Sequence, residues 1–296
     1  MVDVYLFSGF LGSGKTSLLL NVISQIKESG RKPAVFMNEF GSLSIDSDAV
    51  ENGVPLKEVL DGCICCTGSE QTEAQIQSLL EENKDIDVIL IETTGAAHPV
   101  EALDAIYSPI FADQLNIRGI ITVVDSKLWL DRSRLSPQIR ALYMEQIRHA
   151  HLLLANKSDL LTESEMATVS MELANYNEAA PVVQTIGAKI AFSYIEKVLH
   201  STKEKSDTSI ISGKGLPLSS KLITFTESVS RDDFEEWVKS LPETVYRMKG
   251  YVPLEGSINP HLFQYAYGMV SWLPEYVKMT PRLVIIGEGI DSIKYE

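Results

Sequence analysis

Short, uninterrupted apolar runs alternate with amphipathic segments along the first two hundred residues of the chain. Runs that are apolar at every position are typical of strands buried on both faces of a parallel sheet. The alternation indicates an α/β fold with a mostly parallel, doubly wound sheet, in which ligands bind at the carboxyl ends of the strands. The apolar runs predict strands at Val4–Phe7, Ala34–Asn38, Val88–Glu92, Ile120–Val124, Leu152–Ala155 and Val182–Thr185. The amphipathic segments predict helices, among them Lys15–Glu28, Glu70–Glu82, Pro137–His149 and Glu163–Tyr176.

The pattern changes near residue 200. Residues 201–213 are polar and follow neither period, which predicts a linker or loop, and we place this linker at 201–219. Strands joined by hairpin-length connections then indicate a small α+β domain on an antiparallel sheet. We therefore expect two domains, residues 1–200 and 220–296. The elements predicted in the second are a helix at Arg231–Leu241 and strands at Lys221–Glu227, Thr244–Leu254, His261–Leu273 and Arg282–Gly289.

Composition and charge narrow the classes of function. The 296 residues carry a net charge of −14, which argues against nucleic acid or an anionic membrane as the main partner, because both bind basic surfaces. No apolar run approaches the roughly 20 residues that cross a bilayer. No basic stretch precedes the first apolar segment, as it would in a signal peptide. Three cysteines without an export signal indicate a cytoplasmic protein whose thiols stay reduced.

A phosphate-binding loop follows the first predicted strand. The segment GFLGSGKT, residues 9–16, matches the pattern G-x-x-x-x-G-K-[ST], with an apolar run before it and a helical segment after it. Glycines in such a loop let backbone N–H groups approach phosphate oxygens, and the helix N-terminus adds partial positive charge. The alternative is a glycine-rich turn that matches by chance, and the flanking strand and helix argue against it. The predicted nucleotide contacts are Gly9, Gly12, Ser13, Gly14, Lys15, Thr16 and Ser17.

Lys15, Glu92 and Gly95 are the candidate catalytic residues. Lys15 would neutralise the β- and γ-phosphate oxygens, and the Thr16 hydroxyl would ligate Mg²⁺. The segment IETTG resembles the switch II element of GTPases, with Glu92 in place of Asp. Glu92 would hold Mg²⁺ directly or through water, and the N–H of Gly95 would sense the γ-phosphate. The segment Asn38–Gly41 opens the polar region expected to contain switch I, although an ordinary glycine turn explains it equally well.

The segment NKSD directly follows the strand predicted at Leu152–Ala155 and resembles the guanine-reading element of GTPases. Asn156, Lys157 and Asp159 are its candidate base contacts. A carboxylate accepts hydrogen bonds from N1–H and the 2-amino group of guanine, and adenine does not offer donors in that arrangement. The alternative is a helix N-cap at Ser158 or Asp159. The phosphate-binding loop elsewhere in the same chain favours GTP.

All three cysteines of the chain lie within four residues, at Cys63, Cys65 and Cys66, between two glycines. A disulfide between such near neighbours would be strained, and three cysteines at a glycine-flanked turn are rarely only packing residues. Thiolates suit Zn²⁺ and softer transition metals. A redox role stays open, because a helix N-terminus lowers the pKa of a thiol. Three thiolates fill at most three corners of a tetrahedron, so a fourth ligand would come from elsewhere.

Together, the phosphate-binding loop, ETTG, NKSD and GCICC resemble the CobW-type family of metal-handling P-loop GTPases over nearly the whole chain. The resemblance implies a P-loop NTPase domain followed by a small α+β domain. It implies a metallochaperone that uses GTP and Mg²⁺. We expect its GTP hydrolysis to be slow without a partner, because the motifs position no obvious catalytic Arg or Gln. Its partner would be a client metalloprotein or a cofactor-biosynthesis enzyme, and a homo-oligomer is compatible with it. The metal at the three cysteines would be Zn²⁺ or Co²⁺, with Ni²⁺ also compatible, and Glu39 would be a further ligand.

The chain departs from the family pattern at His98, and two other functions are compatible with parts of the sequence. His98 stands in AHP where relatives often read ADP, so it is either an additional metal ligand or, more commonly for such a residue, a surface histidine. A P-loop kinase of small molecules is one rival function, and the segment NKSD counts against it. A non-catalytic thiol sensor of metal or redox state is the other.

Overall fold

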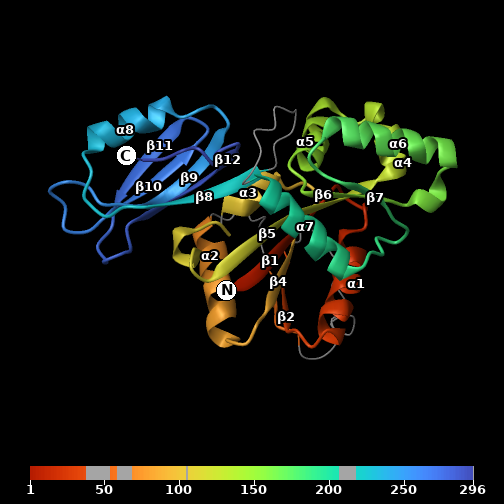
Figure 1. The fold of residues 1–296 in the computed structure, drawn as a ribbon, viewed down its shortest axis with the longest axis horizontal. Helices are drawn as coiled ribbons and strands as arrows, with labels where there is room; N and C mark the ends of the chain where they lie inside the picture. Colours follow the sequence, from red (N-terminus) through yellow and green to blue (C-terminus); the bar gives the residue numbers. More distant parts are fainter. Residues whose placement is uncertain (38–53, 59–68, 105, 207–217, 296) are drawn as a thin grey trace. The chain divides into compact units, whose positions relative to one another are not determined.

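The computed structural model describes residues 1–37, 54–58, 69–104, 106–206 and 218–295, which form two compact units (Figure 1). The first unit holds Met1–Ala102 and Gln114–Pro217, and the second holds Leu103–Asp113 and Leu218–Glu296. A short segment from the middle of the chain therefore belongs to the C-terminal unit. The domain boundaries predicted from the sequence placed this segment, which begins eight residues after Gly95, in the first domain.

The first unit is built on a seven-stranded parallel sheet, in the order β3-β2-β4-β1-β5-β6-β7. Each pairing between its strands is parallel among the described residues, which confirms the predicted α/β class. The apolar pattern did not reveal β3, because a three-residue edge strand with the sequence LKE has no apolar run. The strands are β1 Val2–Ser8, β2 Pro33–Met37, β3 Leu56–Glu58, β4 Val88–Glu92, β5 Leu115–Asp125, β6 Leu152–Asn156 and β7 Val182–Gln184.

Helices connect these strands. Polar side chains define where two of them begin: the Ser136 hydroxyl accepts the N–H of Ile139 at the start of α5, and Thr162 and Glu165 form a capping box at the start of α6. The helices are α1 Lys15–Glu28, α2 Ser69–Glu82, α3 Pro99–Asp104, α4 Ser126–Leu130, α5 Pro137–Arg148, α6 Glu163–Tyr176 and α7 Phe192–Ser206. Short 3₁₀ turns lie at Pro109–Phe111, Arg132–Arg134 and Ser158–Leu160.

Helix α7 corrects the linker predicted over 201–219. It continues to Ser206, so the first residues of the polar stretch are helical, and β8 then begins at Leu218. The polar composition misled the prediction because only the first half of α7 carries the apolar residues that pack on the sheet, among them Ile195 and Leu199.

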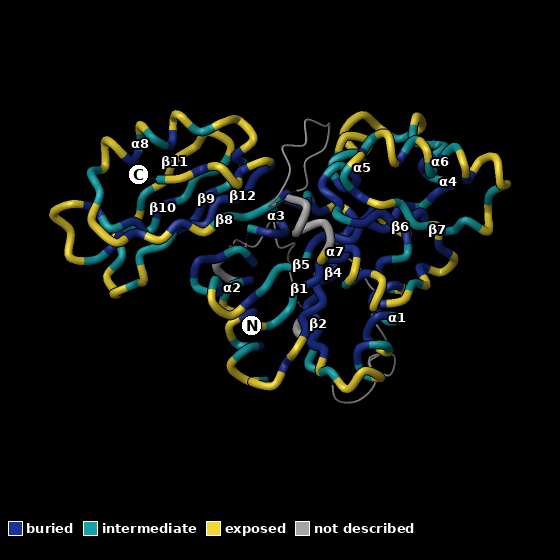
Figure 2. Tube along the Cα trace, viewed as in Figure 1, coloured by how far each residue is buried: buried dark blue, intermediate teal, exposed yellow. Residues whose placement is uncertain are grey.

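The central strands of the first unit are largely buried (Figure 2), and their successive residues enter two separate hydrophobic cores. Leu152 and Leu154 lie in the core formed with α1 and α7, whereas Leu153 and Ala155 lie in the core formed with α4, α5 and α6. Side chains alternate between the two faces of a strand, and helices cover both faces here. All five residues of β6 are consequently buried, which explains why the strand reads as an uninterrupted apolar run.

The second unit is built on a five-stranded antiparallel sheet, in the order β11-β10-β9-β12-β8. One long helix, α8 Arg231–Ser240, packs on it through Phe234 and Val238. This arrangement confirms the predicted α+β class of the C-terminal part. The strands are β8 Leu218–Thr224, β9 Val245–Val252, β10 His261–Ala266, β11 Met269–Pro274 and β12 Arg282–Glu288.

The single strand predicted over His261–Leu273 is wrong, because this segment folds as the hairpin of β10 and β11. Tyr267 and Gly268 form the turn, with φ of 45° and 90°. A two-residue hairpin turn uses such positive φ values, and Ala266 pairs with Met269 across it. The apolar residues on both sides concealed the turn, and Tyr-Gly lacks the Asn or Asp that usually marks one.

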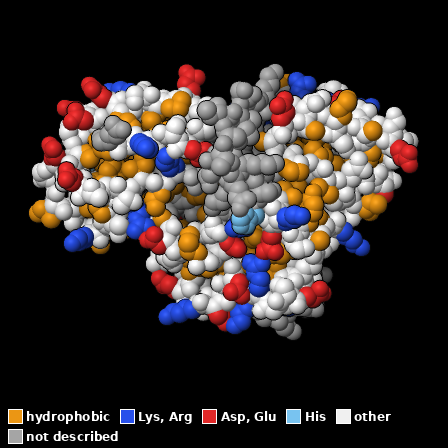
Figure 3. Space-filling view, in the orientation of Figure 1, with side chains coloured by type: hydrophobic (Ala, Val, Ile, Leu, Met, Phe, Trp, Pro, Cys, Tyr) orange, Lys and Arg blue, Asp and Glu red, His pale blue; other side chains and the backbone are white. Residues whose placement is uncertain are grey.

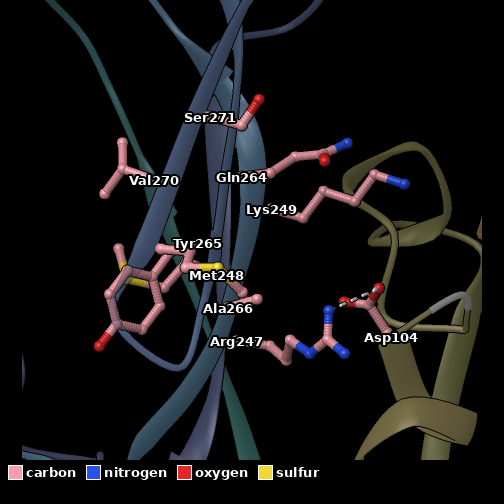
Figure 4. Close-up of a pocket in the computed structure, with 10 residues that line it drawn as sticks. Asp104, Arg247, Met248, Lys249, Gln264, Tyr265, Ala266, Val270 and Ser271 are labelled. Atoms are coloured by element: carbon pink, nitrogen blue, oxygen red, sulfur yellow. Dashed lines mark ion pairs between the residues drawn. The ribbon is translucent and has the colours of Figure 1, made fainter.

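Ion pairs attach the segment Leu103–Asp113 to the sheet of the second unit. Arg247 of β9 pairs with Asp104 at 3.9 Å, and Arg282 of β12 pairs with Asp113 at 2.8 Å. The first pair lies at a cavity of about 150 Å³, where the side chains of Lys249 and Gln264 extend from the sheet on the same side as that of Arg247 (Figure 4). Tertiary ion pairs of this kind carry no local sequence signal, so this association could not be predicted.

Acidic and basic side chains are interspersed over the face shown in Figure 3. Exposed apolar side chains of the second unit include Met269, Val270 and Leu273 of β11. Among the described residues, no helix is both long enough and apolar enough to cross a membrane.

Substituting Phe234 with Ala tests the core of the second unit. Phe234 is fully buried and contacts the rings of Phe225, Phe263 and Trp272. Removing a core ring leaves a cavity, so we expect Phe234→Ala to lower the free energy of unfolding by about 3–5 kcal/mol in urea denaturation. The control is Tyr276→Ala, whose side chain is 86% exposed and which should change stability by less than about 0.5 kcal/mol. Equal stability of the two variants would contradict the described core.

Candidate nucleotide and metal site

The phosphate-binding loop joins the end of β1 to the start of α1. Gly9 and Gly14 require glycine, because their φ values of 138° and 111° lie in a region that other residues rarely adopt. A Cβ on Gly14 would lie 2.5 Å from Nδ2 of Asn156, and a Cβ on Gly9 would overlap the carbonyl of Val123. The loop therefore approaches β5 and β6 more closely than a side chain would allow.

Lys15 is folded back over this loop. The residue is 7% exposed, and its Nζ donates a hydrogen bond to the carbonyl oxygen of Phe10 at 3.2 Å. The N–H of Ser13 donates to the same carbonyl oxygen at 3.2 Å, so one carbonyl orients both the ammonium and the turn. A buried ammonium gains most from anionic partners, and phosphate oxygens are partners of that kind.

The two residues predicted to hold Mg²⁺ are in direct contact. The Thr16 hydroxyl donates a hydrogen bond to Oε1 of Glu92 at 2.8 Å. Glu92 is 8% exposed and ends β4, where it pairs with Phe7 of β1 in parallel register. The register thus brings a nearly buried carboxylate to the first turn of α1. A hydroxyl and a carboxylate oxygen are the hard oxygen ligands that Mg²⁺ takes, so these residues fit that ion.

Asn156 joins three loops at the carboxyl edge of the sheet. Its Nδ2 donates to the carbonyl oxygen of Ser13 at 2.8 Å. Its Oδ1 accepts from the hydroxyl of Thr185 at 3.2 Å and from the N–H of Ala188 at 2.8 Å. The residue is 2% exposed. Its amide therefore fixes the loops that follow β1, β6 and β7 relative to one another.

Lys157 and Asp159 take different positions at the end of β6. Lys157 has φ of 62°, and its Nζ donates to Oδ2 of Asp125 at 2.6 Å. Asp159 lies in the 3₁₀ turn Ser158–Leu160 and is exposed. Its carboxylate is consequently accessible to a ligand, as reading a guanine base requires. The contacts of Asn156, Lys157 and Asp159 with a base stay predictions.

Gly95 packs directly against the phosphate-binding loop. A Cβ on it would lie 2.5 Å from the backbone N of Leu11. From the other side, Nε2 of Gln146 donates to the carbonyl oxygens of Gly95 and Ala97, both at 3.1 Å. Gln146 is fully buried in α5, and sequence reasoning missed it because a pattern does not say which polar residue of a helix is buried. The predicted γ-phosphate sensor is thus held between the phosphate-binding loop and α5.

Three potential metal ligands meet near this contact. His98, Glu145 and His149 each have a ligand atom within 4.8 Å of those of the other two. Nε2 of His149 and Oε2 of Glu145 are 3.1 Å apart, and this hydrogen bond lowers the pKa of Glu145 below its ordinary value. Only His98 was singled out from the sequence. The signal for the other two was their spacing of four residues on one helix, which puts them on the same face.

The remaining predicted site residues either lie in or next to the phosphate-binding loop or fall outside the described residues. Gly12, with φ of 70°, lies in the phosphate-binding loop, and Ser17 lies in the first turn of α1. Outside the described residues lie the predicted transition-metal ligands and the predicted switch I segment: Cys63, Cys65, Cys66, Glu39 and Asn38–Gly41.

The parallel sheet, the phosphate-binding loop and the Thr16–Glu92 contact define a P-loop nucleotide-binding fold. The chain belongs to the CobW/HypB/UreG family: the model of that family's nucleotide-binding domain matches residues 3–184. The model of the cobalamin synthesis protein CobW C-terminal domain matches residues 218–296. These matches confirm the resemblance drawn from the motifs.

Curated relatives carry names that refer to zinc. The chain is 36% identical over 169 residues to the zinc chaperone YeiR of Escherichia coli, a match that covers 56% of this chain and 50% of that protein. It is 32% identical over 208 residues to the zinc chaperone CobW of Pseudomonas aeruginosa, covering 60% and 55%. The chain thus spans about half the length of these two relatives. The chain is 27% identical over 281 residues to the zinc chaperone YjiA of E. coli, a match that covers 89% of this chain and 85% of that protein.

Solved structures with the same fold include the Zn(II)-bound YjiA GTPase of E. coli. The two chains superpose with a TM-score of 0.51 at 22% identity, covering 97% of this chain and 94% of the other. A Zn(II)-bound triple mutant of YjiA gives a TM-score of 0.53 over the same shares. This likeness concerns the fold and extends over both units.

Substituting Asn156 with Ala tests the link between the loops. The variant leaves the carbonyl of Ser13 and the N–H of Ala188 without their amide partner, at about 1–3 kcal/mol for each buried group left unpaired. We expect Asn156→Ala to lower the free energy of unfolding by at least that amount in urea denaturation of the nucleotide-free protein. The exposed Asp159→Ala is the matched control and should change stability by less than about 0.5 kcal/mol. An Asn156→Ala protein as stable as this control would refute the link.

Proposed function

We propose that this chain is a GTP-dependent metal chaperone. It binds GTP with Mg²⁺ and hydrolyses it, and it couples this cycle to binding and release of a transition metal at Cys63, Cys65 and Cys66. Zinc is the favoured cargo, ahead of cobalt and nickel. The partner is a client metalloprotein or a cofactor-biosynthesis enzyme that receives the metal.

The observation that carries the nucleotide part of this proposal is the contact between Thr16 and Glu92 at 2.8 Å. It joins the phosphate-binding loop to the predicted switch II element through a hydroxyl and a nearly buried carboxylate. These two residues would hold Mg²⁺, which supplies charge neutralisation at the β- and γ-phosphate oxygens. The ammonium of Lys15, buried beside the same loop, would bind those oxygens from the protein side.

Hydrolysis would be controlled through the loop at Gly95. The backbone of Gly95 packs against Leu11 of the phosphate-binding loop, and Nε2 of Gln146 donates to the Gly95 carbonyl at 3.1 Å. A γ-phosphate bound next to this loop would therefore shift Gly95 and, through it, Gln146. The recognised motifs supply no Arg or Gln to stabilise the transition state or orient the attacking water, which supports slow hydrolysis without a partner.

The metal part of the proposal rests on the cysteine cluster and on the relatives. YeiR and YjiA are named zinc chaperones, and a relative from Schizosaccharomyces pombe, 30% identical over 192 residues, is named a zinc-regulated GTPase metalloprotein activator. Three thiolates between the two predicted switch elements offer borderline-soft ligands with an open fourth position. If nucleotide and metal favour the same closed state, each raises the affinity for the other, and loss of the γ-phosphate releases the cargo.

A binding comparison between GTP and ATP tests the choice of nucleotide. We expect tighter binding of Mg·GTP than of Mg·ATP, because the Asp159 carboxylate accepts from guanine and finds no such donors on adenine. Asp159→Ala removes a charged acceptor worth about 1.5–3 kcal/mol, so GTP affinity should fall about 10- to 100-fold while ATP affinity stays unchanged. Glu163→Ala, a nearby exposed carboxylate, serves as the control in the same calorimetric titrations. A preference for ATP would refute the proposal and favour a small-molecule kinase.

Zinc titration in the presence of Mg·GDP or of Mg²⁺ with a non-hydrolysable GTP analogue tests the coupling. We expect the zinc affinity to differ between the two states by about 5- to 150-fold, the usual range of coupling between two sites. The triple variant Cys63→Ser, Cys65→Ser, Cys66→Ser should lose the thiolate-bound zinc while keeping its affinity for GTP. Equal zinc affinity in both nucleotide states would contradict the coupled chaperone and leave a simple thiol sensor.

A further inference from the structure

His98, Glu145 and His149 form a compact set of metal-ligand groups from two separate elements. Their ligand atoms lie within 4.8 Å of one another. Tetrahedral zinc holds nitrogen and oxygen ligands at about 2.0–2.2 Å, which puts the ligand atoms about 3.4 Å apart. The side chain of Glu145 would have to move to close that difference, whereas Nδ1 of His98 accepts the N–H of Val100 at 3.3 Å, so Nε2 is the nitrogen of His98 that would bind an ion.

The side chains of this set are already oriented toward one another. The ring centroids of His98 and His149 are 6.0 Å apart, and Oε2 of Glu145 lies 3.1 Å from Nε2 of His149. Because an ionised carboxylate only accepts, Nε2 of His149 carries the proton in this pair. A metal ion would take the place of that proton between the two atoms, and the proton would move to Nδ1. The other oxygen of Glu145 lies 3.8 Å from Nη1 of Arg148, a half-exposed ion pair that leaves the carboxylate free to move toward an ion.

Two imidazoles and one carboxylate select a particular class of ion. Calcium and magnesium prefer all-oxygen sites, and Cu⁺ prefers thiolates, whereas zinc and its neighbours bind nitrogen and oxygen together. Three protein ligands leave a fourth position open, so the ion would exchange with solvent or with a further ligand. His149 is 1% exposed and the other two residues are half-buried, so the set differs from an ordinary group of surface side chains.

The loop after β4 carries His98 and contacts the phosphate-binding loop at Gly95, and α5, which ends next to His149, holds this loop through Gln146. His98 lies three residues after Gly95 on the same loop, whereas Glu145 and His149 flank Gln146 at the end of α5. Gln146 holds the carbonyls of Gly95 and Ala97 from α5. A shift of the Gly95 loop would therefore change the distance from His98 to the other two ligands.

We propose that His98, Glu145 and His149 are a second, regulatory site for a zinc-class divalent ion, formed by ligands other than the three cysteines. An ion bound there ties the loop after Gly95 to α5 and so stabilises one nucleotide state of the protein. The site itself is independent of the proposed function, and only its coupling to nucleotide depends on it.

Metal binding by the full chain with Cys63, Cys65 and Cys66 all changed to Ser tests the site without the thiolates. We expect this variant to bind one equivalent of zinc in competition with a chromogenic chelator. With Co²⁺ it should show visible bands of nitrogen and oxygen coordination, without thiolate charge transfer in the near ultraviolet. Absence of this equivalent would overturn the site, whatever the thiolates of the unmodified protein do.

Matched variants in the same thiol-free background identify the ligands. His98→Ala and Glu145→Gln should each weaken zinc binding by at least about tenfold, since even outer-shell partners of a metal cost 10- to 100-fold. His200→Ala removes an exposed histidine of α7 and should leave the affinity unchanged. Circular dichroism monitors folding of each variant, and Glu145→Gln keeps the side-chain volume. Equal loss in all three variants, or none in His98→Ala, would overturn the assignment.

Nucleotide titrations of the thiol-free chain test the regulatory role. We expect zinc to change the ratio of affinities for GDP and a non-hydrolysable GTP analogue by about 5- to 150-fold, with the reciprocal change in zinc affinity. His98→Ala should abolish this effect while the nucleotide still binds. If zinc binds at these residues and the ratio stays the same, the regulatory role is refuted. If neither nucleotide binds, the proposed GTPase function is refuted. The zinc titrations of the variants then test on their own whether His98, Glu145 and His149 bind an ion.

Discussion

The parallel register between β1 and β4 is the constraint on which the nucleotide site depends. Phe7 pairs with Glu92, so the two strands end together and their following loops leave the sheet as neighbours. This is why the Thr16 hydroxyl, on the helix after β1, reaches a carboxylate 76 positions away in the sequence at 2.8 Å. A shift of one residue would turn Glu92 to the opposite face of the sheet and separate it from Thr16.

Two buried amides then organise the loops that the sheet has brought together. Asn156 connects the phosphate-binding loop to the loops after β6 and β7, and Gln146 connects the loop after β4 to α5. The Asn156 amide donates through Nδ2 and accepts through Oδ1, whereas Nε2 of Gln146 donates to two carbonyl oxygens, so each side chain satisfies backbone groups that have no strand partner. Both amides lie beside the phosphate-binding loop, and each joins it or its neighbours through a few specific hydrogen bonds.

Local pattern was sufficient wherever the physical cause was local. Helix α1 Lys15–Glu28 and helix α6 Glu163–Tyr176 have the predicted bounds, because a glycine turn and a capping box mark where they begin. Pattern failed at the β10–β11 hairpin, where Tyr267 and Gly268 make the turn between two apolar segments. It also failed at Leu103–Asp113, which joins the C-terminal unit through ion pairs to Arg247 and Arg282 that no local rule encodes.

The sequence by itself determined the fold class, the phosphate-binding loop and the family. A loop whose backbone approaches phosphate closely needs glycines, a lysine and a hydroxyl at fixed spacing, and that spacing is visible in the sequence. Only the tertiary structure decided which distant side chains meet. His98 was an isolated histidine in the sequence, and packing of its loop on α5 puts it beside Glu145 and His149. The reason is that such contacts depend on the docking of a loop on a helix, in which the distant, buried Gln146 holds the carbonyls of Gly95 and Ala97.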